Sequence, residues 1–303
     1  MNPSFFIGPG QVNLTVPSHI DGKPVTTVAP QAFPDIYVHE VFFPDTLTTL
    51  EPWCIDSGMG GIGILHIPAS VKTMENLMDS GSGTRIGIII FEEGFKTLPE
   101  KIFFWNGGPE KLILPDSLEY LSPDSMYLYS VGELCLGANV RLGAYQPGGG
   151  VWHGARSFVR LHNITLSPEN PYYTLNDGFL IEKETGRLVL SAIFLRTCTI
   201  PAGAGIRVIG TQSICEVNQY RIEIPDGVTE IESEAISGDF YDIVLPASIR
   251  TLGDGFASSY RELTIIYRGT MEEWSRVSTG NLGGWTVRCL DGTLQIEALP
   301  DEP

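Results

Sequence analysis

The chain repeats one short phrase, in which apolar residues, a proline and a few polar residues precede two apolar residues three positions apart. The phrase is IPDGVTEI at residues 224–231, LPASIRTL at 245–252 and FPDTLTTL at 43–50. Its prolines are Pro44, Pro68, Pro115, Pro201, Pro225 and Pro246, and Glu92 takes the proline position in one further copy. Pro44 and Pro68 lie 24 residues apart, as do Pro201 and Pro225. A fixed period of this size predicts a repeat architecture, because each copy is one structural unit that stacks on the next.

Each copy is interpreted as one short strand and a return to the core. Before the proline, polar and apolar residues alternate, as in RIEI at 221–224, which indicates a strand with one buried face. Proline cannot donate a hydrogen bond to a strand ladder, so it ends the strand. An apolar pair such as Val228 and Ile231 then returns to the core. A small or aromatic residue follows it, as in Ala32-Phe33, Trp53, Ala235-Ile236 and Phe256.

The repeat predicts a leucine-rich-repeat solenoid. We expect it to be right-handed and mainly β, with short strands forming a parallel sheet and short helical turns or loops on the other side. The alternative is a β-sandwich, which also spaces short strands closely but does not repeat the same residues at the same offsets. In one coil we expect Ile222, Ile224, Val228 and Ile231 in the core. Arg221 and Glu223 of the same coil are expected to face outward.

The repeats resemble those of the BspA-like leucine-rich-repeat proteins, which are mostly bacterial surface proteins. Three features carry the resemblance: the repeat itself, the insert NPYYTLNDGFLIEKETGRLVLSAI at 170–193, and the C-terminal phrases IIYRGTMEEW at 265–274 and VRCLDGTLQI at 287–296. Together they cover roughly residues 14–297. The resemblance implies binding or adhesion at the cell surface or in a secreted protein, and it supplies no catalytic residues.

We expect a single solenoid over residues 1–297. It would have an N-terminal cap at about 1–28, an irregular loop at 143–158, the insert at 170–193 and a C-terminal cap at 265–297, followed by a disordered tail at 298–303. The copies between 125 and 166 are poorly formed. Gly137 stands there at a position where proline is expected.

The charge balance excludes some classes of partner. A formal net charge of −17 argues against nucleic acid, which binds clustered lysine and arginine, and disfavours an anionic membrane surface. No stretch has the length and apolarity of a transmembrane helix. The first residues lack the basic segment and long apolar run of a signal peptide, so a cytoplasmic location stays open.

Five cysteines are widely spaced, at Cys54, Cys135, Cys198, Cys215 and Cys289. Their odd number and spacing favour free, mostly buried thiols over a disulfide framework. No loop has the ligand spacing of a calcium or zinc site, so we expect no metal and no cofactor.

Signals for catalysis are weak. The histidines lack metal-ligand spacing, and Trp152-His153-Gly154 is more simply interpreted as part of a loop than as a site. Glu223 and Asp242 should lie on neighbouring strands beside Arg221, where we expect an exposed salt-bridge cluster rather than a catalytic pair. We therefore expect no enzyme. A carbohydrate-active enzyme remains an alternative.

The outward strand positions predict two rows along the solenoid. One row is Phe42, His66, Ile90, Ile113, Cys135, Thr165, Thr199, Glu223, Val244 and Ile266. The other is Glu40, Ile64, Ile88, Lys111, Glu133, Asn163, Thr197, Arg221, Asp242 and Thr264. The early strands are notably apolar, and an exposed apolar patch often marks an interaction site.

The candidate interaction face comprises Phe42, Ile64, His66, Ile88, Ile90, Lys111 and Ile113. The sequence favours a binding module that presents this face to a protein or glycan. Self-association, with the same face buried between two chains, is the structural alternative.

Overall fold

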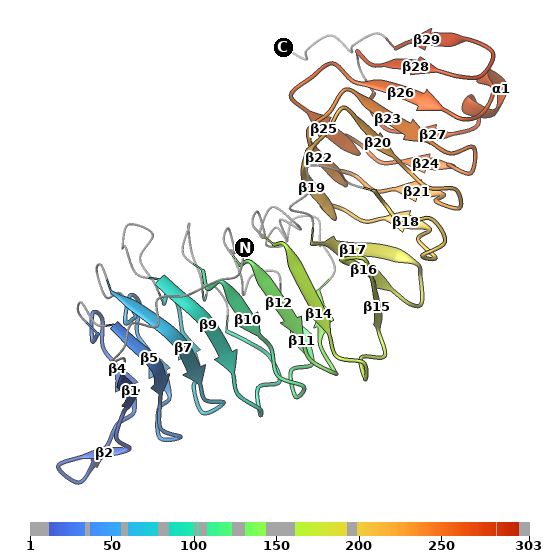
Figure 1. Ribbon diagram of the computed structural model, residues 1–303. Helices are drawn as coiled ribbons and strands as arrows, with labels where there is room; N and C mark the ends of the chain where they lie inside the picture. Colours follow the sequence, from blue (N-terminus) through green and yellow to red (C-terminus); the bar gives the residue numbers. More distant parts are fainter. Residues whose placement is uncertain are drawn as a thin grey trace. The chain divides into compact units, whose positions relative to one another are not determined.

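The computed structural model describes residues 12–33, 37–55, 60–77, 85–99, 102, 108–122, 131–143, 161–192, 199–282 and 284–296, without the side chain of Glu216. The chain divides into two compact units. Unit 1 is Met1–His153 with Ser157–Pro171, and unit 2 is Gly154–Arg156 with Tyr172–Pro303. Each unit is a stack of short strands (Figure 1). The single solenoid and cap boundaries expected from the sequence stay predictions.

Unit 1 is built around one sheet of parallel strands. Its elements are β1 (Val12–Thr15), β2 (His19–Ile20), β3 (Lys23–Pro24), β4 (Thr27–Val28), β5 (Tyr37–Phe42), β6 (Thr49–Leu50), β7 (Gly61–Ile67), β8 (Thr73–Met74), β9 (Arg85–Phe91), β10 (Lys111–Ile113), β11 (Tyr120–Leu121), β12 (Glu133–Leu136), β13 (Arg141–Leu142) and β14 (Asn163–Leu166). The main sheet has the order β1-β5-β7-β9-β10-β12-β14. The two-residue strands β4-β6-β8 and β11-β13 form separate parallel sheets, and β2-β3 is a small antiparallel hairpin.

Unit 2 begins with an antiparallel insert and continues with stacked coils. Its elements are β15 (Tyr173–Asn176), β16 (Phe179–Glu182), β17 (Arg187–Ser191), β18 (Val208–Ile209), β19 (Ile214–Asn218), β20 (Arg221–Glu223), β21 (Glu230–Ile231), β22 (Ile236–Asp239), β23 (Asp242–Leu245), β24 (Thr251–Leu252), β25 (Ala257–Ser259), β26 (Thr264–Tyr267), α1 (Met271–Trp274), β27 (Ser278–Thr279), β28 (Thr286–Arg288) and β29 (Thr293–Gln295). Three sheets have the orders β15-β16-β17-β18-β21-β24-β27, β19-β22-β25 and β20-β23-β26-β28-β29.

The expected leucine-rich-repeat solenoid is confirmed. Equivalent strands of successive coils pair in parallel, as β20, β23 and β26 do, whereas the sandwich alternative requires antiparallel sheets. Among the described residues α1 is the only α-helix, and no helix there has the length and apolarity needed to cross a membrane.

The core follows the repeat phrase. Ile222, Ile224, Val228 and Ile231 are all fully buried in one continuous cluster of unit 2, as the sequence predicts. Arg221 and Glu223 are exposed. Burying one such side chain stabilises a fold by about 1.5–3 kcal/mol, so stacking the coils supplies the stability that one coil lacks.

Two of the turns that follow a strand are completed by the next coil. The backbone N–H of Gly94 donates to Ser117 Oγ at 2.7 Å, and that of Gly227 donates to Ser248 Oγ at 3.2 Å. Both glycines have φ in the left-handed region, and each serine lies two residues after a repeat proline. Ser117 and Ser248 therefore each serve the preceding coil as a hydrogen-bond acceptor.

A column of left-handed residues precedes the returning core side chains. In unit 1 it contains Gln31, Trp53 and Asn76, and Trp53 has φ 60°. The N–H of Gln31 donates to the carbonyl of Trp53, and the N–H of Trp53 donates to that of Asn76. The sequence pattern predicts that Trp53 is one of the small or aromatic residues that follow the apolar pair. This prediction is wrong, because the residue that holds this place in the coil is the next one along the chain. Cys54 fills the core there, and Trp53 is 50% exposed.

In unit 2 the same column contains Gln212, Glu234 and Gly255. The N–H of Gln212 donates to the carbonyl of Glu234, and the N–H of Glu234 donates to that of Gly255. The position therefore accepts side chains of very different size, because what it requires is a backbone conformation.

Gly137, which replaces the expected proline, is required by a close approach of two coils. A Cβ at this position would lie 2.3 Å from the carbonyl oxygen of Pro115, so a side chain cannot be accommodated without a shift. The carbonyl of Gly137 accepts a hydrogen bond of 3.1 Å from the buried amide of Asn170, the first residue of the insert motif. The same amide donates to the carbonyl of Val140 at 3.1 Å.

Four cysteines lie in the described residues and all are free thiols. Cys54 and Cys215 are buried, while Cys135 and Cys289 are partly exposed. Cys198, most of the expected loop 143–158, the Trp152-His153-Gly154 segment and the tail 298–303 lie outside the described residues.

Candidate interaction face

The main sheet of unit 1 aligns the two predicted outward rows. Phe42 pairs with His66, His66 with Ile90, Ile90 with Ile113 and Ile113 with Cys135. In the second row Glu40, Ile64, Ile88, Lys111 and Glu133 pair in the same order. Adjacent strands in a sheet lie about 4.8 Å apart, so the residues of each row are direct neighbours. The repeat register predicted both rows correctly across these strands.

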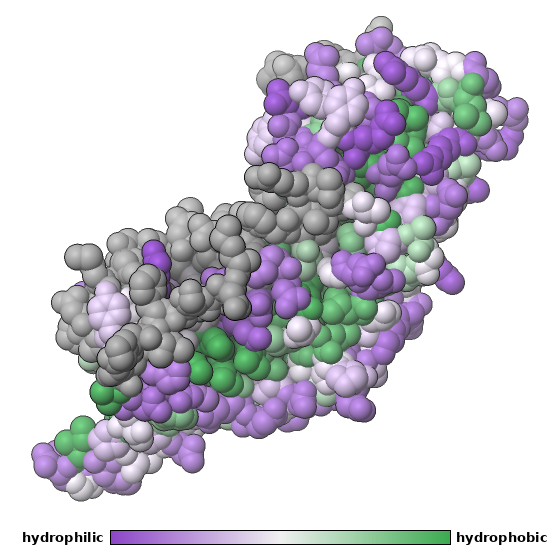
Figure 2. Space-filling view, viewed as in Figure 1, coloured by the Kyte–Doolittle hydropathy of each residue, from purple (hydrophilic) through white to green (hydrophobic). Residues whose placement is uncertain are grey.

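The outward side of these strands, called the strand face below, is apolar in its middle. Every member of the candidate set is half-buried, so its side chains are neither core residues nor fully open to solvent. The inward positions between them, such as Leu65 and Ile89, are fully buried. Figure 2 shows hydrophobic side chains gathered on the visible face of unit 1, bordered by hydrophilic ones.

His66 organises one end of the strand face. Its ring stacks on Phe42 of the preceding coil, with centroids 4.5 Å apart and planes inclined by 18°. His66 Nε2 lies 2.8 Å from Glu40 Oε1, and Nδ1 lies 3.9 Å from Glu92 Oε1. Glu92, the residue at the missing proline position, thus places a carboxylate at the rim of the face.

A lysine–glutamate pair borders the other end. Lys111 Nζ lies 3.1 Å from Glu133 Oε2, and His162 Nε2 lies 4.0 Å from Glu133 Oε1. The hydrogen bond to Glu133 raises the pKa of Lys111. The isoleucines therefore lie between two polar clusters, both of which contain glutamate.

Glycines beneath the rows allow the strands to approach closely. Gly63 lies opposite His39, and Gly87 opposite Gly63, between the register points of β5, β7 and β9. A Cβ on Gly63 would lie 2.4 Å from the carbonyl oxygen of His39, and one on Gly87 would lie 2.6 Å from that of Gly63. Two residues separate the buried Ile62 from the buried Leu65, so the alternation shifts here, as in a β-bulge. This shift sets which side chains reach the strand face.

Unit 2 continues the same row positions but makes a polar surface. Glu223 pairs in register with Val244 and Ile266, and Arg221 with Asp242 and Thr264. Arg221 Nη2 donates to Asp242 Oδ2 at 2.8 Å, which confirms the expected ion pair.

Three details of unit 2 differ from the sequence expectation. Val244 is only 4% exposed and Asp242 only 8%, so these two row members are buried. Glu223 pairs with Arg268, through Nη2 and Oε2 at 2.9 Å. These partners belong to the coils on either side of β23, so the ion pair spans the strand that carries Val244. Thr199 lies outside any strand, and Thr197 is outside the described residues.

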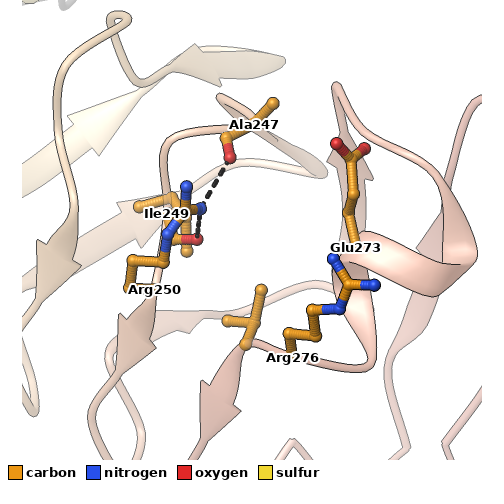
Figure 3. A pocket seen from close by; sticks show the side chains of 6 residues that line it. Ala247, Ile249, Arg250, Glu273 and Arg276 are labelled. Carbon is orange, nitrogen blue, oxygen red and sulfur yellow. Dashed lines mark hydrogen bonds between the residues drawn. The ribbon is translucent and has the colours of Figure 1, made fainter.

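The charged side chains that line one cavity of unit 2 make local contacts. A cavity of about 210 Å³ is lined by Ala247, Ile249, Arg250, Glu273, Arg276 and Val277 (Figure 3). Arg250 Nη1 donates to the carbonyl oxygens of Ala247 and Ile249 at 2.8 and 2.7 Å. Glu273 accepts the N–H of Thr270 at 2.8 Å in the capping box of α1, and Arg276 pairs with Glu272.

The described residues contain no group of three or more histidine, cysteine, aspartate or glutamate side chains that could hold a metal ion. The sequence pattern also did not single out Tyr220, Tyr241 and Tyr260, three exposed tyrosines of unit 2. They lie outside the strand alternation, in the turns between strands, where the repeat phrase makes no prediction.

Comparison with solved structures finds three bacterial proteins of low similarity. A leucine rich cell surface protein from Faecalibacterium prausnitzii A2-165 is 15% identical, with 88% of this chain and 90% of that chain covered and a TM-score of 0.42. A leucine-rich repeat protein from Eubacterium ventriosum ATCC 27560 is 14% identical, with 84% and 60% covered and a TM-score of 0.39. The pneumococcal vaccine antigen PcpA is 13% identical, with 88% and 86% covered and a TM-score of 0.37.

No curated protein matches the chain. The family described as "BspA type Leucine rich repeat region" matches residues 12–131 and 191–273 in six copies. These matched segments include the main sheet of unit 1 up to β10 and the coils of unit 2 up to α1. The repeat phrase, the parallel stacking of coils and this match over most of the chain agree: the chain belongs to the BspA-type leucine-rich-repeat family.

Proposed function

We propose that this chain is a non-enzymatic binding module that contacts a protein partner through the strand face of unit 1. The observation that supports the proposal most directly is the in-register block of half-buried isoleucines Ile64, Ile88, Ile90 and Ile113. Isoleucine favours strands, but strand propensity alone does not require apolar residues on both faces of a sheet. A partner that covers this block would remove apolar surface from water.

The chemistry of the face favours a protein over a glycan. The isoleucines offer no hydrogen-bond donors or acceptors, whereas a glycan presents many hydroxyl groups whose burial without partners is costly. The rim carries the carboxylates of Glu40, Glu92 and Glu133. We therefore propose a partner surface with an apolar centre and basic residues around it, because such a surface complements both parts.

The carboxylates of unit 2 support a non-catalytic role. Glu223 and Asp242, the pair on neighbouring strands, are each joined to an arginine, Arg268 and Arg221. Both carboxylates are thus held in ion pairs within the chain. The cell surface is the setting we propose, as the family resemblance implies.

The test is a pair of charge insertions on the strand face. Ile90→Glu and Ile113→Glu should abolish binding in a screen of immobilised matrix proteins and glycans, while circular dichroism and the melting temperature stay close to those of the parent chain. Tyr120→Glu is the matched control. It introduces the same charge at a residue that is exposed on β11, outside the strand face.

Three results would contradict the proposal. If Ile90→Glu and Ile113→Glu unfold the chain while Tyr120→Glu does not, the isoleucines are core residues. If the substitutions remove binding to glycans and leave binding to proteins unchanged, the partner is a glycan and the proposed protein partner is wrong. If sedimentation shows a parent dimer that both substitutions convert to a monomer, the face joins two copies of the chain.

A further inference from the structure

Three exposed tyrosines occupy the same turn in successive coils of unit 2. Tyr220 lies between β19 and β20, Tyr241 between β22 and β23, and Tyr260 between β25 and β26. They are 66%, 41% and 87% exposed. Because β22 pairs with both β19 and β25, these turns are neighbours, and the three residues are called the tyrosine cluster below.

Two rings of the cluster are in contact, and a cation approaches one of them. Tyr220 and Tyr241 are stacked, with centroids 5.2 Å apart and planes inclined by 24°. Arg261, beside Tyr260, places its guanidinium carbon 5.4 Å from the centroid of the Tyr241 ring. Tyr220 and Arg261 belong to the coils on either side of Tyr241. The Tyr241 ring thus contacts the Tyr220 ring of one neighbouring coil and the Arg261 guanidinium of the other.

An acidic residue fixes that cation. Arg261 Nε donates to Asp239 Oδ1 at 2.7 Å and Nη2 donates to Oδ2 at 3.2 Å, a two-point contact that holds the guanidinium plane. The other arginine of the region, Arg221, is paired with Asp242. Both cations of the cluster are therefore neutralised by carboxylates of the same chain, and Tyr220 and Tyr260 keep most of their ring surface in solvent.

We propose that the tyrosine cluster is a second interaction surface, and that its partner is a protein segment bearing arginine or lysine side chains. The faces of aromatic rings carry negative potential and attract cations, as Arg261 already does at Tyr241. The chain has a formal net charge of −17, which attracts a basic partner and repels a second copy of itself. Tyrosine and arginine also dominate the energetic centres of protein interfaces.

This inference is independent of the strand face. It concerns unit 2, different residues and a different recognition chemistry, since it needs ring faces instead of an apolar block. The two sets of variants share no residue. Evidence against binding at the strand face would therefore not contradict binding at the tyrosine cluster, and evidence against the tyrosine cluster would not contradict the strand face.

The experiment measures binding of labelled oligo-arginine and oligo-lysine peptides by fluorescence anisotropy at physiological ionic strength, with a neutral oligosaccharide as third probe. The variants are Tyr220→Leu with Tyr260→Leu, and Tyr220→Phe with Tyr260→Phe. Neither pair changes the net charge, and exposed positions tolerate both. Tyr120→Leu, an exposed tyrosine of unit 1, is the control for tyrosine loss elsewhere.

The leucine variants should bind the peptides roughly two- to five-fold more weakly for each ring removed, or about tenfold more weakly for the double variant. The loss should be larger for oligo-arginine than for oligo-lysine. Phenylalanine should bind like the parent, because it retains the ring face. Equal binding by all variants would overturn the proposal in favour of attraction by net charge alone. Equal loss with phenylalanine would assign recognition to the hydroxyl groups, and tyrosine-dependent oligosaccharide binding would assign the cluster to a glycan. Either result overturns it.

Discussion

Arg187 and Glu232 are joined by two hydrogen bonds of 2.7 Å, although 45 residues separate them. Arg187 begins β17 and Glu232 directly follows β21, so the contact ties together coils on either side of β18. The N–H and hydroxyl of Thr211 also donate to Glu232 Oε2, at 2.7 and 3.0 Å. A Cβ on Gly210 would lie 2.7 Å from the guanidinium carbon of Arg187, so glycine leaves room for this contact.

Glu232→Gln should destabilise unit 2 by about 2–3 kcal/mol, because it removes the charge that compensates a largely buried arginine. Urea unfolding at neutral pH checks this value. Arg276→Gln, which removes an exposed partner of Glu272, should cost no more than about 0.5 kcal/mol. Equal costs for the two substitutions would show that burial does not strengthen the Arg187 contact.

The same pair predicts a pH dependence. Burial acts to raise the pKa of Glu232, but hydrogen bonds and charge from Arg187, with help from Thr211, outweigh it and lower the pKa below the ordinary value of 4.5. A lowered folded-state pKa means that the stabilisation is complete above the unfolded-state pKa and is lost as pH falls through the folded-state value. Unfolding free energies measured from pH 6 downward should therefore fall more steeply below pH ~4.5 in the parent chain than in Glu232→Gln. Parallel curves would contradict this assignment.

Two glycines of the same strand should respond differently to alanine. Gly63→Ala places a Cβ 2.4 Å from the carbonyl oxygen of His39, whereas at Gly61 the nearest atom lies at an ordinary 3.6 Å. We expect Gly63→Ala to cost about 3 kcal/mol or more, since backbone must move, and Gly61→Ala to cost less than about 0.5 kcal/mol. Thermal unfolding of the two variants tests the bulge, and similar melting temperatures would exclude it.

Trp53 should tolerate some substitutions and resist others. Its φ of 60° is sterically poor for β-branched residues and acceptable for asparagine, which occupies the same column at Asn76. Trp53→Ile should destabilise the chain by about 1–2 kcal/mol and Trp53→Asn by much less. Chemical denaturation of both variants measures the difference. A larger cost for asparagine would mean that packing of the indole ring determines this position.

Thiol reactivity should follow burial. Burial is the main cause that raises the pKa of Cys54 to about 12, which leaves almost no thiolate at pH ~8. Iodoacetamide labelling followed by peptide mass spectrometry should modify Cys135 in the native chain, and Cys54 only after unfolding in urea. Native labelling of Cys54 at the rate of Cys135 would show that its coil opens readily.

The proline-anchored repeat predicted the fold and the outward rows because both depend on local alternation. Counting back from Pro68, from Glu92 and from Pro115 places Ile64, Ile90 and Ile113 correctly, since these coils turn at the same offset. Trp53 could not be placed this way. Its position is defined by a left-handed backbone, and glycine, asparagine, glutamine and glutamate all occur there, so no residue type marks it.

The repeat pattern did not predict the side-chain contacts between neighbouring coils. The ion pair between Glu223 and Arg268 joins residues 45 positions apart and spans the strand of the buried Val244. The stacking of Tyr220 on Tyr241 likewise depends on two turns that belong to neighbouring coils. Alternation describes one strand at a time, whereas these features belong to the way neighbouring coils meet.

The serine-to-glycine contact between successive coils also bears on how such a chain can lengthen. The two partners hold the same place in their coils: Gly94 and Ser117 each lie two residues after the repeat proline position, as do Gly227 and Ser248. Each of these coils therefore carries either the donor glycine or the acceptor serine, and copying the glycine coil alone would leave one of the two glycines without a serine. Copying both adjacent coils together keeps each glycine beside the serine that accepts its N–H, so the pair of coils is the segment that can be repeated without losing this contact.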